Sequence, residues 1–261
     1  MKSMCSMKFN KQNISIGKNV TIGENVKIGD NVRLYDNVTI GDNCTICNDC
    51  VLGEPVADYY EQSNYINPAT HVGPNSLLRS HSIVYAGSSL GEYFSSGHRV
   101  TVRESFFCGK YVRIGTNCDI QNNVRIENNS WLHSGIFVPA KTHIGKYVMI
   151  YPHVVFTDDP YPPSNQHIPP KVSDFAQVGA GAVILPGVSL GKHVLVGAGT
   201  VVTKSVPDNY CILGNPGKLK KRVEDIILEN GSPAYPWPTR FSRGMPWNGS
   251  EFLTWKQHNY D

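Results

Sequence analysis

An aliphatic residue recurs at every sixth position through residues 72–156, and this spacing restricts the possible folds more than any other feature of the chain. Twelve of the fifteen positions in the series are Val, Leu or Ile, although these types make up only 58 of the 261 residues. The series consists of Val72, Leu78, Val84, Leu90, Ser96, Val102, Cys108, Ile114, Ile120, Ile126, Leu132, Val138, Ile144, Ile150 and Phe156. Such a recurrence is an internal repeat, so we interpret it before any local pattern.

A period of six fits neither the α-helix nor the simple alternation of a strand. It is typical of a parallel β-helix, in which each hexad forms one short strand and one corner, and stacked coils pair their backbones about 4.8 Å apart. Three hexads then close one triangular coil. The sequence therefore predicts an all-β solenoid of about nine coils, with the recurring side chains pointing inward.

Two shorter series flank the central one, at residues 16–52 and 172–202. The first mostly has the form Ile-Gly-x-Asn-Val-x, and we expect its Gly and Asn at the corners because both residues tolerate positive φ. The domain prediction is a lead-in at 1–15, a β-helix at 16–207 and a C-terminal region at 208–261.

Interruptions of the repeat at 54–70 and 157–171 are rich in Pro and Tyr. The first is interpreted as either an irregular corner or a loop leaving the solenoid, with a spacer role slightly favoured. The second is predicted to be a projecting loop, a usual place for substrate contacts on a rigid scaffold.

The C-terminal region is predicted to begin with a helix over 218–230 that ends at Gly231. Its apolar face would contain Leu219, Val223, Ile226 and Ile227. Four basic residues in its first turn oppose the helix dipole, so a phosphate site is favoured there over a solvated basic face. The tail at 232–261 holds three of the four tryptophans and is expected to be packed, covering the solenoid end or offering a stacking surface for a base.

Composition restricts the partners and the compartment. The formal charge is only +3, and no basic stripe with interleaved aromatics indicates a nucleic-acid partner. No run approaches eighteen apolar residues, and Met1–Asn13 lacks the apolar core of a signal peptide, so we expect no membrane insertion and a cytoplasmic location. Cys44, Cys47 and Cys50 are spaced like metal ligands, but two of them occupy positions that hold Val in earlier hexads. Core packing is therefore preferred to a metal site.

The last series carries three motifs in succession, and their order is more specific than any one of them. They are Val-Gly-Ala-Gly-Ala-Val-Ile-Leu-Pro-Gly-Val from Val178, Val-Gly-Ala-Gly-Thr-Val-Val-Thr-Lys from Val196, and Gly-Asn-Pro-Gly-Lys from Gly214. This succession resembles the signature of the hexapeptide-repeat acyltransferases, whose fold is a left-handed parallel β-helix. The handedness comes from the resemblance alone, because the general rule for parallel crossovers would predict a right-handed coil.

The resemblance implies an acyltransferase that uses acetyl-CoA as co-substrate, needs no metal, and is active as a homotrimer with grooves between adjacent subunits. Small residues would follow the pantetheine arm with their backbone groups, and basic residues would lie near the phosphates. The implied coenzyme A-binding residues are Gly179, Ala180, Gly197, Ala198, Lys204, Pro216, Lys218 and Arg222.

His98 is the predicted general base among nine histidines, since imidazole accepts a proton readily near neutral pH. It lies in Ser-Ser-Gly-His-Arg-Val-Thr-Val-Arg-Glu, residues 95–104, which resembles the Gly-His-x-Val-x-Ile-Arg-Glu segment of nucleotide-sugar acyltransferases. The repeat also breaks there, at Ser96, and departures from a local rule tend to mark function. The alternative is a corner histidine that is hydrogen-bonded to a carbonyl, and His81 is the second choice of base.

Because three hexads close one coil, residues eighteen positions apart stack in one column. Thr116 and Ser134 therefore share a column with His98, and Ser134 and His133 would lie within two coils of it. Glu104 is one hexad further on and would orient an imidazole in this or an adjoining chain. The predicted catalytic residues are therefore His98, Glu104, Ser134 and His133.

Ile114–Gln121 and the loop at 157–160 resemble the branch of the family that acylates nucleotide-linked amino sugars, especially dTDP-linked 3-amino or 4-amino dideoxyhexoses. The branch implies N-acyl transfer for surface polysaccharide synthesis, although family members commonly have Asn where Asp158 stands. The expected substrate-binding residues are His81, Arg99, Asp158 and Asp159.

Three other functions remain open. A sugar O-acetyltransferase would use the same scaffold and histidine. A γ-type carbonic anhydrase needs three zinc-binding histidines, and no histidine follows His133 by five positions. A purely structural solenoid would leave the Gly-Asn-Pro-Gly-Lys motif unexplained.

Overall fold

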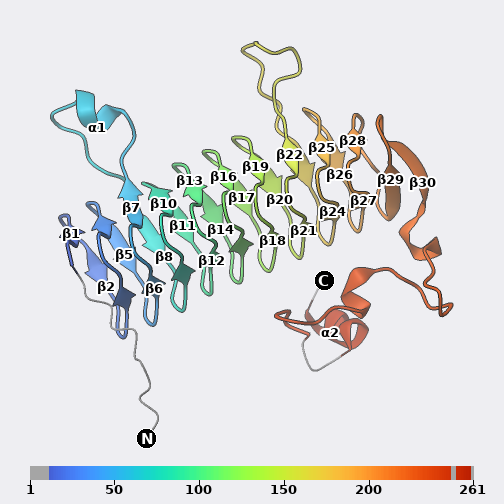
Figure 1. Cartoon of the computed structure of the whole chain (residues 1–261), viewed down its shortest axis with the longest axis horizontal. Coiled ribbons are helices and arrows are strands. Elements are labelled where there is room, and N and C mark those ends of the chain that lie inside the picture. The colour runs from blue at the N-terminus through green and yellow to red at the C-terminus, as the bar shows by residue number, and fades with distance from the viewer. Residues whose placement is uncertain (1–11, 248–250, 260–261) are drawn as a thin grey trace, which may run out of the picture.

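The computed structural model describes residues 12–247 and 251–259, which form a long parallel β-helix (Figure 1). The strands are two to five residues long and build three faces, named here A, B and C. This confirms the predicted left-handed parallel β-helix, but the solenoid has more than the predicted nine coils, because two of its faces contain ten and eleven strands.

Face A contains ten strands. They are β1 (Ser15–Ile16), β4 (Arg33–Leu34), β7 (Val51–Glu54), β10 (Ile83–Tyr85), β13 (Thr101–Val102), β16 (Asp119–Ile120), β19 (Phe137–Val138), β22 (Val155–Phe156), β25 (Val183–Ile184) and β28 (Val201–Val202). Face B contains nine. They are β2 (Thr21–Ile22), β5 (Val38–Ile40), β8 (Thr70–Val72), β11 (Ser89–Leu90), β14 (Phe107–Cys108), β17 (Arg125–Ile126), β20 (His143–Ile144), β23 (Lys171–Val172) and β26 (Ser189–Leu190).

Face C contains eleven strands, of which the last is antiparallel. They are β3 (Lys27–Ile28), β6 (Thr45–Ile46), β9 (Leu77–Leu78), β12 (Ser95–Ser96), β15 (Arg113–Ile114), β18 (Trp131–Leu132), β21 (Met149–Ile150), β24 (Gln177–Val178), β27 (Leu195–Val196), β29 (Tyr210–Leu213) and β30 (Lys218–Arg222). The helical elements are α1 (Asp58–Glu61), η1 (Val223–Asp225), η2 (Trp237–Thr239) and α2 (Phe252–Asn259).

The six-residue series forms the core. Cys108 and Ile144 pair with Ile126 from the coils on either side, and all three side chains are buried. Cys44 and Cys50 are buried in the same core, as the packing interpretation predicted. Ser96 also points inward, where its hydroxyl accepts a hydrogen bond of 3.0 Å from the Arg79 N–H.

The corners follow one rule along the solenoid. Counted from the inward-pointing residue, the fourth residue of most hexads has a left-handed backbone, as at Asn19 with φ 55° and Asn117 with φ 57°. The prediction for Asn is therefore confirmed. The glycines at the second position serve another purpose, because a Cβ on Gly23 would lie 2.7 Å from the Asp42 nitrogen of the next coil. Apart from Gly53, which has φ 74°, those glycines allow coils to approach and do not supply positive φ.

Two loops leave the solenoid between a strand of face A and the next strand of face B. The first joins β7 to β8 and contains α1, and the second joins β22 to β23. Figure 1 shows both projecting from the same side of the stack. In the second loop, Asp158 contacts His167.

The predicted helix over 218–230 is wrong. Lys218–Arg222 forms β30, which pairs antiparallel with β29, and only a short 3₁₀ turn, η1, follows. The last strand of a solenoid exposes unpaired backbone groups, so pairing there outweighs a helical pattern of side chains. Lys218 therefore does not lie at a helix N-terminus, and no helix dipole favours a phosphate there.

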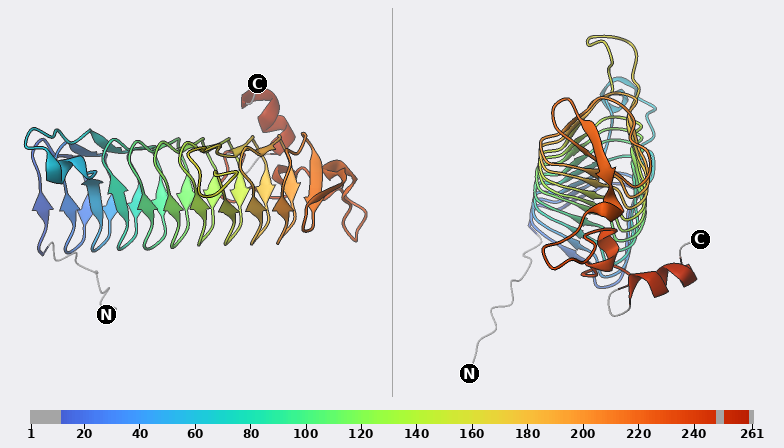
Figure 2. Two further views of the ribbon diagram at one scale, coloured as in Figure 1. Left: turned by 90° about the horizontal axis from the view of Figure 1, so that it is seen from above. Right: turned by 90° about the vertical axis from the view of Figure 1, so that its right-hand side faces the viewer.

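The tail turns back along face C and does not cap the solenoid end (Figure 2). Trp237, Met245, Trp247 and Phe252 form a second apolar cluster with Met149. The Trp237 indole N–H donates a hydrogen bond of 3.1 Å to the Phe175 carbonyl. The described tail is packed, as expected.

In the part of the chain that the structure describes, no helix has the length and apolarity needed to cross a membrane.

Candidate functional site

One edge of the solenoid, between the strands of face C and those of face A, carries most of the predicted site; we call it the C–A corner. Backbone N–H···O bonds of 2.8–3.0 Å join successive coils along it. Its central column contains His98, Thr116, Ser134, Pro152, Ala180 and Ala198. The predicted stacking of His98, Thr116 and Ser134 is thus observed, and the column continues into the Gly-Ala-Gly motifs.

The Gly-Ala-Gly coils form the C-terminal end of this corner. A Cβ on Gly179 would lie 2.5 Å from the Ala198 nitrogen, so consecutive coils touch through their backbones. Ala180 and Ala198 are exposed, and no larger side chain stands at these column positions. The result is a narrow strip of exposed backbone.

The hairpin between β29 and β30 covers the end of the corner. The Gly214 N–H donates to the Thr200 hydroxyl at 3.2 Å, and the Gly217 N–H donates to the Val201 carbonyl at 2.8 Å. Pro216 lies within this turn, and Lys218 follows it. The structure therefore brings Pro216 and Lys218 to the same end of the solenoid as the Gly-Ala-Gly coils.

Lys204 and Arg222 lie elsewhere in the single chain. Lys204 follows β28 and is at the next corner, between faces A and B, which we call the A–B corner. Arg222 pairs opposite Tyr210 at the far side of face C, where its guanidinium binds the Glu224 carboxylate. Neither residue adjoins the glycine strip within one protomer.

His98 presents an exposed imidazole on the C–A corner. Its backbone N–H donates to the Thr116 hydroxyl at 3.2 Å, and its carbonyl accepts from the Asn117 N–H at 3.0 Å. Among the described residues no hydrogen bond to the imidazole is found. The described part of the chain therefore does not show the alternative, in which the His98 imidazole is hydrogen-bonded to a carbonyl. Four strand spacings, about 19 Å, separate His98 from Ala180.

His133 lies closer to the glycine strip, about 10 Å or two strand spacings from Gly179. Its ring stacks on Tyr151 with a centroid distance of 5.1 Å and an interplanar angle of 11°. Burial lowers the pKa of His133 from its ordinary value, which favours the neutral imidazole at neutral pH. Ser134, the next residue, is exposed at the same corner.

Glu104 lies at the A–B corner, across face A from His98. Its carboxylate accepts a hydrogen bond of 2.9 Å from Arg103 Nε, and the Arg103 guanidinium lies 4.8 Å from the Tyr85 ring centroid. Glu104 does not orient His98 within one chain. The other part of the prediction, that Glu104 orients an imidazole of an adjoining chain, remains a prediction.

The predicted substrate residues divide between the two corners. Arg99 is at the C–A corner and donates from Nε to the Asn117 amide oxygen at 2.8 Å. His81 is at the same corner, one coil earlier. Asp158 and Asp159 lie in the second loop, at the A–B corner, where Asp158 contacts His167 Nδ1 at 3.1 Å. One chain therefore does not bring the four residues together.

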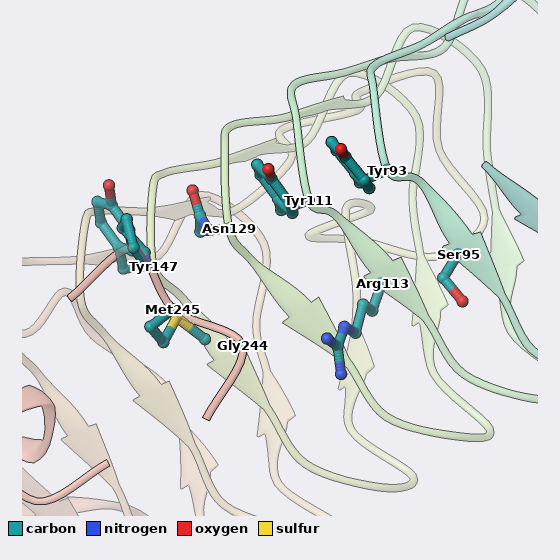
Figure 3. Close-up of a pocket in the computed structure, with 9 residues that line it drawn as sticks. Tyr93, Ser95, Tyr111, Arg113, Asn129, Tyr147, Gly244 and Met245 are labelled. Atoms are coloured by element: carbon teal, nitrogen blue, oxygen red, sulfur yellow. The ribbon is translucent and has the colours of Figure 1, made fainter. Parts of the chain in front are cut away.

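The sequence interpretation missed a groove between the tail and face C, where two adjoining cavities of about 510 and 540 Å³ share Arg113. Figure 3 shows the first, with Tyr93, Tyr111 and Tyr147 along one side and Gly244 and Met245 across from them. No motif marks this groove. The available signal was Trp131 and Met149 at outward-facing strand positions, where a large apolar side chain indicates a covering segment.

Two segments of the repeat match a known protein family. The family described as "Bacterial transferase hexapeptide (six repeats)" matches residues 19–54 and 169–204. These two segments are therefore similar to the hexapeptide repeats of that family.

Curated relatives include two proteins named galactoside O-acetyltransferase. The one from Lactococcus lactis is 31% identical over 129 residues, which is 46% of this chain and 56% of that protein. The one from Escherichia coli is 25% identical over 172 residues, 58% of this chain and 81% of that protein. The chain thus spans little more than half the length of the Lactococcus relative.

A solved structure of an Arabidopsis UDP-N-acetylglucosamine acyltransferase has the same fold. It superposes with a TM-score of 0.67 at 16% identity, covering 80% of this chain and 73% of the plant protein. At this identity, the comparison supports the β-helix and nothing beyond it.

Proposed function

We propose that this protein is an acyl-CoA-dependent N-acyltransferase that transfers an acetyl group to the amino group of a nucleotide-linked amino sugar. The observation that carries the proposal is the shared C–A corner. The column that contains His98 and the two Gly-Ala-Gly coils lie on one edge of the same solenoid. The donor would lie along the glycine strip with its acyl group toward the histidines.

The glycine strip suits a thin pantetheine arm. Gly179, Ala180, Gly197 and Ala198 leave the backbone accessible, so amide groups of the arm would meet backbone N–H and C=O groups directly. Lys218 supplies a cation at the end of the strip for a phosphate. In the proposed homotrimer, Lys204 would act from a neighbouring subunit, since it lies on the opposite corner of its own chain.

The chemistry requires one proton acceptor. The sugar ammonium would release a proton to His98, and the free amine would attack the thioester carbonyl and form the C–N bond. Backbone N–H groups of the corner would stabilise the oxyanion. The C–S bond then breaks, the nitrogen gives its second proton to the leaving thiolate, which departs as the coenzyme A thiol, and His98 returns its proton to solvent. Glu104 of the adjoining chain would orient the imidazole, while Ser134 and His133 line the path of the acyl group.

O-acetyl transfer is the second candidate, favoured by the names of the Lactococcus and Escherichia relatives. The same imidazole would deprotonate a sugar hydroxyl. Because scaffold and base are shared, the acceptor alone separates the two reactions.

Release of free coenzyme A thiol from acetyl-CoA tests the proposal, with dTDP- and UDP-linked amino sugars compared with their hydroxy counterparts. We expect turnover with an amino sugar and a loss of about 10²- to 10⁴-fold in His98→Ala. His143→Ala, an exposed histidine on face B, is the matched control and should retain activity. Turnover only with hydroxy sugars would establish the second candidate, and unchanged activity in His98→Ala would refute the assigned base.

A further inference from the structure

The second cavity of the groove, under η2 and the segment that follows it, has the composition of a ligand site. It is lined by Arg113, Trp131, His133, Met149, Tyr151, Gln177, Trp237, Phe241 and Arg243. Strands β15, β18, β21 and β24 form its floor, and the tail forms its roof. Its His133 end reaches the C–A corner, so the cavity opens toward the proposed site of acyl transfer.

The walls of the cavity are mostly aromatic. Trp131 and Phe241 meet edge to face with centroids 5.6 Å apart, and Phe241 also contacts Trp237 at 6.0 Å. The opposite end is the His133–Tyr151 stack. Flat rings on several sides favour a flat aromatic ligand over a branched aliphatic one.

Two polar atoms in the cavity wall are buried without a hydrogen-bond partner among the described residues: the Trp131 indole N–H and the Gln177 Oε1. The Gln177 residue is only 8% exposed. Leaving such groups unpaired costs about 1–3 kcal/mol each. A ligand edge that offers both an acceptor and a donor would satisfy them. Pyrimidine and purine bases have such edges.

Two guanidinium groups adjoin this aromatic surface. Arg113 lies 4.0 Å from the Trp131 ring centroid, and Arg243 is on the tail opposite. Within the described residues, neither has a carboxylate at ion-pair distance. Burial, followed by the charge of Arg243, lowers the pKa of Arg113. An anion between the two cations would offset both the burial of the Arg113 charge and its repulsion by Arg243.

We propose that this groove binds a nucleoside diphosphate, with the base between the aromatic side chains near Gln177 and the phosphates between Arg113 and Arg243. The inference deepens the proposed function and rests on it in one respect: the nucleotide would be the carrier of the acceptor sugar. The sugar would then leave the groove beside His133, at the C–A corner.

The test is calorimetric titration of the full chain without any acyl donor, using dTDP, UDP, thymidine, inorganic pyrophosphate and coenzyme A as separate ligands. We expect dTDP or UDP to bind at least tenfold more tightly than thymidine or pyrophosphate. Arg243→Gln should weaken diphosphate binding at least tenfold while leaving thymidine binding little changed. Gln177→Leu should weaken both. Arg125→Gln, an equal loss of charge on face B, is the control and should bind dTDP as the wild type does.

Several outcomes would overturn the site: no heat with either diphosphate, or equal affinity of Arg243→Gln and wild type. Coenzyme A that competes with dTDP and loses affinity in Arg243→Gln would support a nucleoside phosphate site but assign it to the donor. Because the titration contains no donor, it is independent of the thiol-release assay: dTDP binding here with no turnover there would refute the proposed function and retain the site. Turnover that is unaffected in Arg243→Gln would retain the proposed function and refute the site.

Discussion

The fourth residue of most hexads is held in a left-handed backbone conformation even when it is not glycine. This conformation costs most L-residues about 1–2 kcal/mol, so each coil needs compensation from its neighbours. Asn19 donates from its amide to the Asn37 amide oxygen one coil on, at 3.1 Å. Tyr93 and Tyr111 instead stack with centroids 4.6 Å apart. Contacts between equivalent residues thus stabilise a corner that single residues disfavour.

The second hexad position is more restrictive, because the next coil occupies the space of a side chain. A Cβ on Gly91 would lie 2.3 Å from the Gly109 carbonyl oxygen. We expect Gly91→Ala to lower the free energy of unfolding by about 1–3 kcal/mol, as overpacking typically does. Urea unfolding followed by circular dichroism measures this. Ser89→Ala, two residues away, should change stability by less than about 0.5 kcal/mol. Equal stability of the two variants would contradict the close-approach argument.

At the scale of elements, a stack of rings joins the solenoid to its tail. Tyr147, Phe175 and His193 occupy equivalent corners in three coils, with centroid distances of 4.9 and 4.8 Å. The same Phe175 contacts Phe252 of α2 at 5.7 Å. The His193 Nδ1 atom is buried without a described partner, and burial lowers the pKa of His193 to about 4.

The stability of the chain should therefore depend on pH through His193. The unfolded state binds a proton near the ordinary pKa of 6.5, while the folded state binds it only near 4. Stability is complete above pH 6.5 and falls as the pH drops toward 4, by about 3 kcal/mol at most. Urea unfolding at pH 7 and pH 5 should show a smaller pH effect in His193→Phe, which keeps the stack. An identical loss in that variant would exclude His193 as the cause.

At the scale of the whole molecule, face A is the surface that we expect a second copy of the chain to cover. The tail already covers part of face C, whereas Phe137 and Val155 of face A are 37% and 38% exposed. Face A also lies between the C–A corner, with His98, and the A–B corner, with Glu104. Association through this face would join two corners that one chain keeps apart.

Phe137→Glu should therefore convert the proposed homotrimer into monomers and abolish acyl transfer. Light scattering after size-exclusion chromatography gives the mass, and thiol release gives the activity. Phe107→Glu places the same charge on face B at a similarly exposed position and should leave the oligomer intact. A monomeric wild-type chain, or an intact trimer in Phe137→Glu, would refute assembly through face A.

The repeat could be predicted because every hexad specifies its own strand and corner. Inward residues such as Ile126 and left-handed Asn residues recur in the sequence at the spacing at which they stack in space. The His98 column follows from the same arithmetic. The Gly-Ala-Gly coils join that column because the second loop leaves and returns without changing the order of the faces.

The C-terminal region could not be predicted in this way, because its structure depends on distant partners. Lys218–Arg222 becomes a strand only because β29 exposes an edge, and Trp237 finds its hydrogen-bond partner 62 residues earlier in the chain. The sequence by itself determined the solenoid, its corners and the column that contains His98, since these depend on contacts repeated at short, fixed spacing. Only the tertiary structure decided that the tail lies on face C and brings Arg243 opposite Arg113, because nothing local encodes which face a non-repeating segment will cover.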